Sequence, residues 1–431
     1  MKTYEKYKDS GVQWIGEIPS HWIVKRFKDC HYEVDNRVEE RWSDFPLLSL
    51  SKKGVIPRDI DSGVGKFPGS FNDYKEIEPD DLIFCLYDIE ETPRTIGLSD
   101  LHGMITGSYK VFRTNGVLPK YTYYVYLSID DVKGLKPFYT GLRNVVRPET
   151  FKSLPFITPP LPEQHQIVSF LDEKTSLNDD LIKKKEQKIG LLKEYRTSLI
   201  NRVITKGLNP DCPMKDSGVE WIGEIPSHWD VKRLKHLSEV IPSNVDKHIY
   251  PEEIQVRLCN YTDVYYNEKI DSSTELKSGS CDEHEYHKYH VQKNDVIITK
   301  DSESPDDIGV PCLISEQLEN VVCGYHLTIL RPVNIDGEYL FRFIQTDGTR
   351  RYFEVSSNGM TRYGLGKSSI ENLFVCSPPL SEQHQIVTFL DQKTGEIDRT
   401  IQSEKNKIEL LKEYRQSLIS SVITGKIKVV N

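Results

Sequence analysis

Residues 163–205 read EQHQIVSFLDEKTSLNDDLIKKKEQKIGLLKEYRTSLINRVIT, and residues 382–424 repeat them as EQHQIVTFLDQKTGEIDRTIQSEKNKIELLKEYRQSLISSVIT. The two copies are identical at 27 of 43 positions and lie 219 residues apart. A shorter repeat precedes each of them: KDSGVQWIGEIPSHWIVKR at 8–26 returns as KDSGVEWIGEIPSHWDVKR at 215–233. The stretches between the repeats share almost no sequence. We interpret the chain as one structural frame written twice around two different inserts.

The longer repeat has the pattern of a single long helix. Apolar residues recur at the a and d positions of a heptad, which predicts a coiled-coil seam. Polar residues interrupt the seam at matching places in the two copies, at Thr175 and Arg196 and again at Thr394 and Arg415. A proline pair precedes each copy and a glycine follows it, as is typical of helix boundaries. With about 1.5 Å per residue, each helix is roughly 65 Å long.

Two such helices are each other's natural partners, because neither can bury its apolar stripe alone. Since a whole domain separates them along the chain, we predict that they pack antiparallel. The alternative is that each helix packs inside its own domain, but typical globular helices are far shorter. The predicted core of the helix pair consists of Val168, Leu171, Ile182, Ile189, Leu192, Leu199, Val203, Val387, Leu390, Ile401, Ile408, Leu411, Leu418 and Val422.

The inserts, residues 27–160 and 234–379, have the pattern of α/β domains. Runs of β-forming residues occur at 82–87, 121–127 and 295–299, with turn-forming residues between them. The sequence predicts an α/β fold in which two such domains are separated by two long antiparallel helices forming a coiled coil, with a pseudo-twofold internal repeat. The expected boundaries are 1–160 for the first repeat segment and domain, 161–206 for the central helix, 207–379 for the second repeat segment and domain, and 380–431 for the final helix.

Composition excludes several classes of protein. The 431 residues are 37% hydrophobic and 28% charged, with a formal net charge of −9. No apolar run reaches the roughly 18–20 residues that cross a bilayer, and no signal peptide is recognisable, so we expect no membrane partner. Eight cysteines without a CxxC pair favour reduced thiols in the cytoplasm. The acidic balance argues against a non-specific nucleic-acid binder, so any DNA contact must come from local patches or basic partners.

Two motif fragments resemble parts of enzyme motifs, but each lacks residues that the motif requires at fixed positions. Residues 359–368 end in Lys-Ser like a phosphate-binding loop, but Thr361 stands where the pattern needs glycine, and no apolar strand precedes it. Pro159-Pro160 and Pro378-Pro379 resemble part of the tetrapeptide of amino-group DNA methyltransferases. Both lack the amide or carboxylate and the aromatic ring that would hold a flipped base. We interpret them as turns that begin the long helices.

Two further candidates fail on geometry. Pro305-Asp306 could open a nuclease motif, but no Glu-x-Lys follows at a useful distance, and a turn is the better interpretation. Cys281, His284, His287 and His290 are spaced three apart, and on a helix that run spans too many turns for one metal ion. We therefore expect no catalytic residue, no metal site and no cofactor bound by this chain itself.

The repeated motifs resemble a known family. They stand at 11–22 (GVQWIGEIPSHW) and 218–229, and at 159–164 (PPLPEQ) and 378–383 (PPLSEQ), with a long helix after each of the latter. In this order they are similar to the specificity subunits of type I restriction-modification systems. The resemblance covers essentially the whole chain, and two copies of each motif make it specific.

The resemblance implies that the inserts are target recognition domains, each reading one half of a split DNA sequence in the major groove. The helix pair would set the number of unread base pairs between the halves, because a stiff spacer holds a register that a flexible linker cannot. Family members are not enzymes themselves. They bind two modification (methyltransferase) subunits, which methylate adenine with S-adenosylmethionine, and restriction (endonuclease) subunits that use ATP join this core. Two nearly identical frames suit two identical partners.

The expected DNA contacts lie in the loop before each long helix. Arginine is the natural reader of guanine, and lysine contacts phosphate. The candidates are Arg143, Arg147 and Lys152 in the first domain and Arg362, Tyr363 and Lys367 in the second, with surface solubility or salt bridging as the alternative for each. For the whole chain, the alternative is a coiled-coil scaffold that bridges two protein partners without DNA readout. A single-chain methyltransferase is opposed by the missing cofactor motifs.

Overall fold

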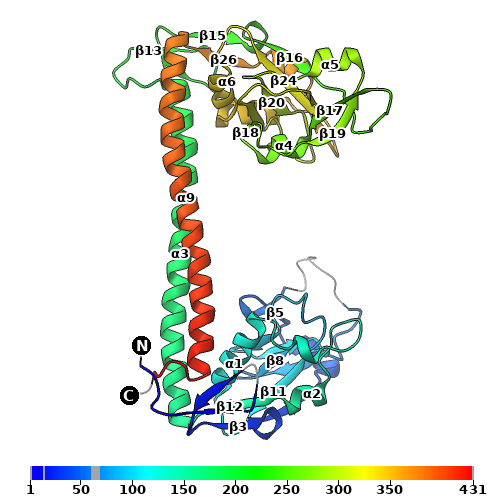
Figure 1. The fold of residues 1–431 in the computed structure, drawn as a ribbon, viewed down its shortest axis with the longest axis vertical. Coiled ribbons are helices and arrows are strands. Elements are labelled where there is room, and N and C mark those ends of the chain that lie inside the picture. Colours follow the sequence, from blue (N-terminus) through cyan, green and yellow to red (C-terminus); the bar gives the residue numbers. More distant parts are fainter. Residues whose placement is uncertain (1, 13–14, 60–67, 430–431) are drawn as a thin grey trace. The chain divides into compact units, whose positions relative to one another are not determined.

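The computed structural model describes residues 2–12, 15–59 and 68–429, and the chain divides into two compact units. Unit 1 comprises Met1–Glu186 together with Lys405–Asn431, and unit 2 comprises Gln187–Glu404. Two helices, α3 (Leu161–Lys206) and α9 (Leu380–Ile423), pass through both units (Figure 1). Each unit therefore holds one α/β domain and a part of each long helix.

The domain of unit 1 is built on an antiparallel sheet in the order β4-β11-β8-β9. Helix α1 (Pro119–Asp131) follows β11 and shares its core, where the ring of Phe27 meets those of Phe84 and Phe112 edge to face. Such aromatic contacts supply much of the buried area of a small core. The elements of this domain are β4 (His31–Val34), β5 (Leu48–Ser51), β6 (Gly54–Pro57), β7 (Lys75–Ile77), β8 (Leu82–Phe84), β9 (Ile96–Leu98), β10 (Gly103–Ile105), β11 (Lys110–Thr114), α1 and α2 (Pro148–Ser153).

One strand expected from the sequence is wrong. Residues 121–127 lie inside helix α1 and not in a strand. Pro119 stands in the first turn, where its missing N–H costs nothing, and Tyr121, Tyr124 and Val125 are buried at helical spacing. Burial of one helical face outweighs the β propensity of these aromatic residues, because propensity is the weaker effect. The strand expected at 295–299 is confirmed as β20 (Val296–Thr299), and that expected at 82–87 is confirmed in its first half, as β8 ends at Phe84.

Unit 2 repeats this strand order and extends it. Its main sheet has the order β16-β24-β20-β22-β18, with β18 and β22 parallel and the other pairs antiparallel. A second sheet, β19-β17-β23, shares a core with it. The elements of this domain are β16 (Ser238–Pro242), β17 (Ile254–Cys259), α4 (Tyr261–Tyr266), β18 (Lys269–Ile270), β19 (Lys277–Cys281), α5 (Glu283–Tyr289), β20, β21 (Asp301–Ser302), β22 (Pro311–Ile314), β23 (Val321–Cys323), β24 (Leu327–Pro332), α6 (Gly337–Ile344), α7 (Asp347–Ser356), β25 (Tyr363–Gly364) and α8 (Lys367–Glu371).

The shorter repeat forms the same small structure in both units. Each copy folds into a hairpin and then sends a strand to pair, antiparallel, with the strand that leads into the long helix. We call this structure, together with the start of the following long helix, the frame. Its strands are β1 (Tyr7–Asp9), β2 (Glu17–Pro19), β3 (Ile23–Arg26) and β12 (Pro155–Thr158) in unit 1, and β13 (Met214–Asp216), β14 (Glu224–Pro226), β15 (Asp230–Arg233) and β26 (Phe374–Ser377) in unit 2.

The long helices pack antiparallel in each unit. In unit 1, Asn178 Nδ2 donates to the Leu411 carbonyl at 3.1 Å. In unit 2, Lys188 Nζ lies 3.0 Å from Glu404 Oε1. In unit 2 the partner numbers rise on α3 as they fall on α9, from Lys188–Glu404 to Arg196–Asp398. In unit 1, Ile167 and Leu171 share a core with Ile419 and Val422, whereas Asn178, farther along α3, meets the earlier Leu411. All fourteen residues of the predicted helix-pair core lie buried or half-buried, so the heptad positions face away from solvent.

Among the described residues, no helix is both long enough and apolar enough to cross a membrane.

Candidate nucleic-acid interface

Each frame is held by a glutamate in the first turn of its long helix. In unit 1, Glu163 Oε2 accepts hydrogen bonds from Trp22 Nε1 at 2.8 Å and lies 2.9 Å from His21 Nε2. Its other oxygen accepts from the Tyr4 hydroxyl at 2.9 Å. Burial and this carboxylate raise the pKa of Tyr4 well above its ordinary value. The repeated Trp and Glu are thus the two halves of one contact, which satisfies a carboxylate that is otherwise costly to bury.

Unit 2 repeats the contact with the same atoms. Glu382 Oε2 accepts from Trp229 Nε1 at 3.0 Å and lies 2.8 Å from His228 Nε2. The glutamine after each glutamate also has a duplicated role. Gln164 accepts from the Leu118 N–H just before α1, and Gln383 accepts from the Asp336 N–H just before α6. Because α1 and α6 follow equivalent strands, the two frames contact their different domains at the same place through the same glutamine side chain.

Polar residues on the helix seam attach each domain to the helix pair. In unit 1, Asp172 Oδ1 accepts from the Tyr124 hydroxyl of α1 at 2.7 Å. In unit 2, the equivalent Asp391 accepts from Arg342 Nη2 of α6, also at 2.7 Å. Burial alone would raise the pKa of Asp391, but Arg342 holds it below its usual range. The seam threonines take part in the same contacts, since Thr175 Oγ1 lies 3.3 Å from the Tyr124 hydroxyl and Thr394 Oγ1 lies 3.4 Å from Arg342 Nη2. The domains therefore dock beside these two polar breaks in the heptad pattern.

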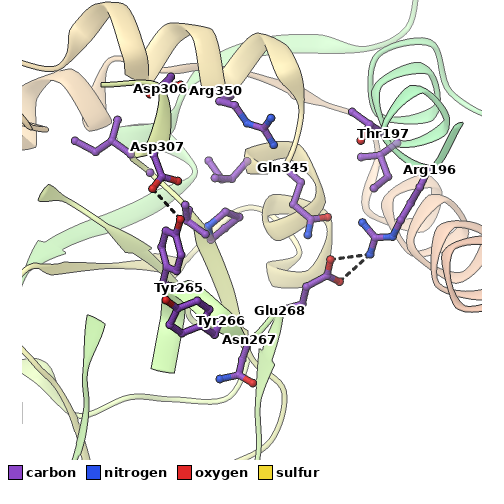
Figure 2. Close-up of a pocket in the computed structure, with 16 residues that line it drawn as sticks. Arg196, Thr197, Tyr265, Tyr266, Asn267, Glu268, Asp306, Asp307, Gln345 and Arg350 are labelled. Carbon is purple, nitrogen blue, oxygen red and sulfur yellow. Dashed lines mark hydrogen bonds and ion pairs between the residues drawn. The ribbon is translucent and has the colours of Figure 1, made fainter. Parts of the chain in front are cut away.

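Unit 2 adds a second attachment beside a cleft of about 410 Å³ (Figure 2). Arg196 Nη2 of α3 donates to both oxygens of Glu268 at 2.7 and 2.9 Å, and Arg196 Nε lies 3.1 Å from Asp398 of α9. On the other side of the cleft, the Tyr265 hydroxyl donates to Asp307 at 2.8 Å, which raises the pKa of Tyr265 to about 12. With Asp306 also on its wall, the cleft is rich in carboxylates.

The structure places the DNA-contact candidates of the first domain in two different situations. Arg143 is exposed, forms an ion pair with Asp88 and lies 5.1 Å from the ring of Tyr87. Arg147 is exposed at the residue before α2. Lys152 lies 2.7 Å from Glu33 and is mostly covered, and this ion pair raises its pKa. Arg143 and Lys152 are thus both paired with an acidic residue of the domain, but Arg143, like Arg147, is exposed, whereas Lys152 is mostly covered.

The candidates of the second domain lie around one histidine and one short strand. Arg362 is exposed, and its Nη2 lies 3.2 Å from both ring nitrogens of His326. Tyr363 is half-buried on β25, which pairs with β21. Lys367 begins α8 and lies 3.6 Å from Glu371, with its side chain about half exposed. The three candidates thus lie close together along the chain, before β25, on β25 and at the start of α8, and Tyr363 is less exposed than the other two.

Arg143 and Arg362 occupy matching places in the two domains. Strands β8 and β20 hold the same position in the two sheets, and an aspartate follows each of them, Asp88 in unit 1 and Asp301 in unit 2. Asp88 pairs with Arg143 directly, whereas Asp301 Oδ2 lies 2.5 Å from Nδ1 of His326, which in turn contacts Arg362. Sequence reasoning missed both aspartates and His326. An acidic residue just after an apolar strand is the one signal that could have pointed to them.

The run of Cys281, His284, His287 and His290 divides between a buried strand end and helix α5. Within the described part of the chain, no three His, Cys, Asp or Glu side chains are grouped so that they could hold a metal ion.

A duplicated frame that carries two unlike α/β domains on paired helices defines a protein with two recognition domains. The sequence matches the type I restriction modification DNA specificity domain over residues 105–191 and 226–413, more than half of the chain. The chain therefore belongs to this family, the specificity subunits of type I restriction-modification systems. One relative is the type I restriction enzyme MjaIX specificity subunit of Methanocaldococcus jannaschii, 23% identical, with 96% of this chain and 95% of the relative covered.

Two solved structures share the fold. A chain from a structure described as the basis of complex assembly and conformational transition of the type I R-M system superposes with a TM-score of 0.70 at 17% identity, covering 95% of this chain and 99% of that one. The HsdS subunit from Thermoanaerobacter tengcongensis gives a TM-score of 0.53 at 16% identity, covering 95% and 98%. The expected fold class, two α/β target recognition domains with two long antiparallel helices, is confirmed.

Proposed function

We propose that this chain is the DNA-reading subunit of its restriction-modification complex. Each variable domain reads one half of a bipartite target, and the helix pair sets the spacing between the halves. One observation carries the proposal: two frames with the same Trp–Glu contact hold domains that differ in sequence, yet an exposed arginine stands at the same topological place in both. A repeated frame that holds two different domains suits a protein that binds two different half-sites.

The chemistry of reading follows from these exposed cations. An arginine donates two hydrogen bonds to O6 and N7 of guanine in the major groove, and neighbouring lysines hold the phosphates. Arg143 and Arg147 in the first domain and Arg362 in the second are exposed to a duplex edge, with Tyr363 and Lys367 close by in sequence. On DNA, Arg143 exchanges its contact with Asp88, and Arg362 its contact with His326, for a base. Lys152 keeps the predicted loop in place through Glu33 and is a supporting residue in this proposal.

The helix pair suits the role of a spacer. Ion pairs across the seam occur at equivalent positions of the two copies: Arg196 of α3 with Asp398 of α9, and Arg415 of α9 with Asp179 of α3. The seam therefore has its own pseudo-twofold register, and a coiled coil with a fixed register is stiffer than a flexible linker of the same length. The spacer segments correspond to 161–206 and 380–431, and the two recognition segments to 1–160 and 207–379.

A duplicated apolar face supports the recruitment of two identical partners. Leu191 and Tyr195 of α3 are exposed one helical turn apart, and Leu410 and Tyr414 of α9 repeat them 219 residues later. Singly exposed apolar side chains are common on protein surfaces, so the support lies in the recurrence of this pair at equivalent positions of both helices. We propose that each face receives one modification subunit, which brings S-adenosylmethionine and methylates adenine. Restriction subunits that use ATP join the same complex, and this chain performs no reaction itself.

Methylome sequencing tests the proposal. Cells that express the chain with its cognate modification subunit should methylate adenine within one bipartite motif that has a constant gap. In vitro, the purified complex should prefer a duplex with that motif over a scrambled one. A complex that forms but treats both duplexes alike would overturn DNA reading and favour a protein scaffold.

A further inference from the structure

The second domain contains a groove that differs in charge from the cleft of Figure 2. It has a volume of about 380 Å³ and lies where the end of β17, the start of α4 and the start of β19 meet the turn between β23 and β24. Its walls, as far as the described residues define them, are formed by Val245, Lys247, Leu258, Asn260, Tyr261, Thr262, Lys277, Ser278, Tyr325 and His326.

The charge of this groove suits a nucleic acid. Lys247 and Lys277 are exposed on its walls, and the described lining residues include no aspartate or glutamate. The cleft of Figure 2, on the same domain, carries three carboxylates, Glu268, Asp306 and Asp307, beside Arg196 and Arg350. A phosphate backbone is drawn to clustered cations and repelled by carboxylates. Of the two hollows, the groove is the one that a DNA strand would approach.

His326 is held at the groove in an unusual conformation. Its φ angle is +72°, in the left-handed region that histidine seldom adopts, and a conformation of this kind persists only where surrounding contacts enforce it. Here Asp301 lies 2.5 Å from Nδ1. A neutral ring that donates from Nδ1 to a carboxylate presents Nε2 as an acceptor. Arg362 Nη2 lies 3.2 Å from both ring nitrogens, so in this structure it is the donor beside Nε2.

We infer that the second domain reads its half-site at this groove, through His326 and Arg362; the inference rests on the proposed function and deepens it. His326 Nε2 accepts from an exocyclic amino group, that of adenine or cytosine, in the major groove. On DNA, Arg362 turns from the imidazole to donate to the O6 and N7 edge of a neighbouring guanine, which leaves Nε2 for the base amino group. Asp301 is the positioning residue that orients the imidazole, and Lys247 and Lys277 contact the flanking phosphates.

The experiment uses the full chain in complex with its modification subunit and a duplex carrying its own bipartite motif. Arg362→Ala and His326→Ala should each weaken specific binding by roughly 10- to 100-fold and relax the methylated motif in one half-site only. Asp301→Asn should weaken binding through the same half-site. Lys247→Ala with Lys277→Ala should weaken binding to all sequences alike and reduce the salt dependence by about two phosphate contacts.

Arg350→Ala is the matched control, because Arg350 is an exposed cation of the same domain on the wall of the carboxylate-rich cleft. It should leave affinity and motif unchanged. Arg362→Lys keeps the charge and guards against a folding defect; it should still lose the guanine preference. If the wild-type complex keeps its bipartite preference while the His326 and Arg362 variants bind and methylate like wild type, this inference fails and the proposed function stands. If the wild-type complex has no preference, both fail.

Discussion

Trp22 donates its indole N–H to Glu163 across 141 residues of sequence, and the bond measures 2.8 Å. The carboxylate lies at the start of α3, and the indole follows the first hairpin, so this bond closes the frame around the helix. Gly425, just after α9, lies against the same tryptophan: a Cβ there would stand 2.3 Å from Pro19 and 3.2 Å from Trp22. One indole therefore meets the beginning of one long helix and the end of the other.

Trp22→Phe should destabilise unit 1 by about 2 kcal/mol, because it removes a donor from a buried carboxylate. Trp229→Phe should cost less, since the side chain of Glu382 is 23% exposed and that of Glu163 only 10%. Hydrogen exchange of peptides from the first turns of α3 and α9 measures both effects. Trp42→Phe, at an exposed tryptophan, is the control. Equal protection in Trp22→Phe and wild type would show that the bond does not support the frame.

Unit 1 should lose stability as the pH falls from about 6.5 to 4. Burial lowers the pKa of His31 to about 4, and its nitrogens bond to the Phe27 carbonyl and the Thr122 hydroxyl. Between these pH values His31 binds a proton in the unfolded chain but not in the folded chain. The free energy of unfolding therefore decreases by up to roughly 3 kcal/mol.

His31→Gln retains hydrogen-bonding groups but cannot titrate, so urea unfolding of this variant should depend less on pH in the same window. His102→Gln, at an exposed histidine, should keep the wild-type dependence. An unchanged pH dependence in His31→Gln would mean that another group is responsible.

Replacing residues 27–160 with the corresponding insert of another family member should change one half of the methylated motif and leave the other half and the gap intact. The reason is that each frame is closed by its own Trp–Glu bond and contacts its domain through the same glutamine side chain. Methylome sequencing gives the result directly. A change in both halves would contradict independent reading by the two domains.

Seven residues added to both α3 and α9, after Glu186 and after Glu404, should lengthen the gap. One heptad preserves the seam and adds about 10 Å, which corresponds to about three base pairs of duplex. Both half-sites should be unchanged. The control is a seven-residue insertion in the loop after Gly207, outside both helices, which should leave the gap as it was. An unaltered gap in the two-helix variant would remove the spacer role.

Leu191→Glu with Tyr195→Glu should reduce the number of bound modification subunits from two to one, because a charged face no longer fits an apolar partner surface. The matched variant on α9, Leu410→Glu with Tyr414→Glu, should do the same, and the four-fold variant should bind none. Native mass spectrometry of the mixed subunits counts the partners. Two subunits retained by the four-fold variant would place the partner surface elsewhere.

Much of the fold was predictable because its signals are local or repeated. Heptad spacing predicts a long helix. Two near-identical helices of this kind in one chain predict that they pack against each other. The polar residues on the long helices could also be identified in the sequence. Their role in docking could not, because it depends on contacts with Tyr124 and Arg342, which lie on helices of the inserts. His326 could not be found by spacing, since its partners Asp301 and Arg362 reach it from separate elements. The helix at 121–127 was missed because tertiary burial, not composition, decides between helix and strand there.

Unit 2 is one uninterrupted stretch, whereas unit 1 is assembled from two pieces with the whole of unit 2 between them. During synthesis, all residues of unit 2 are therefore translated before the segment from Lys405 onward, which belongs to unit 1. Domains generally fold as units during synthesis. Unit 1 is thus the first to be translated and the last to fold, because it needs the last turns of α9.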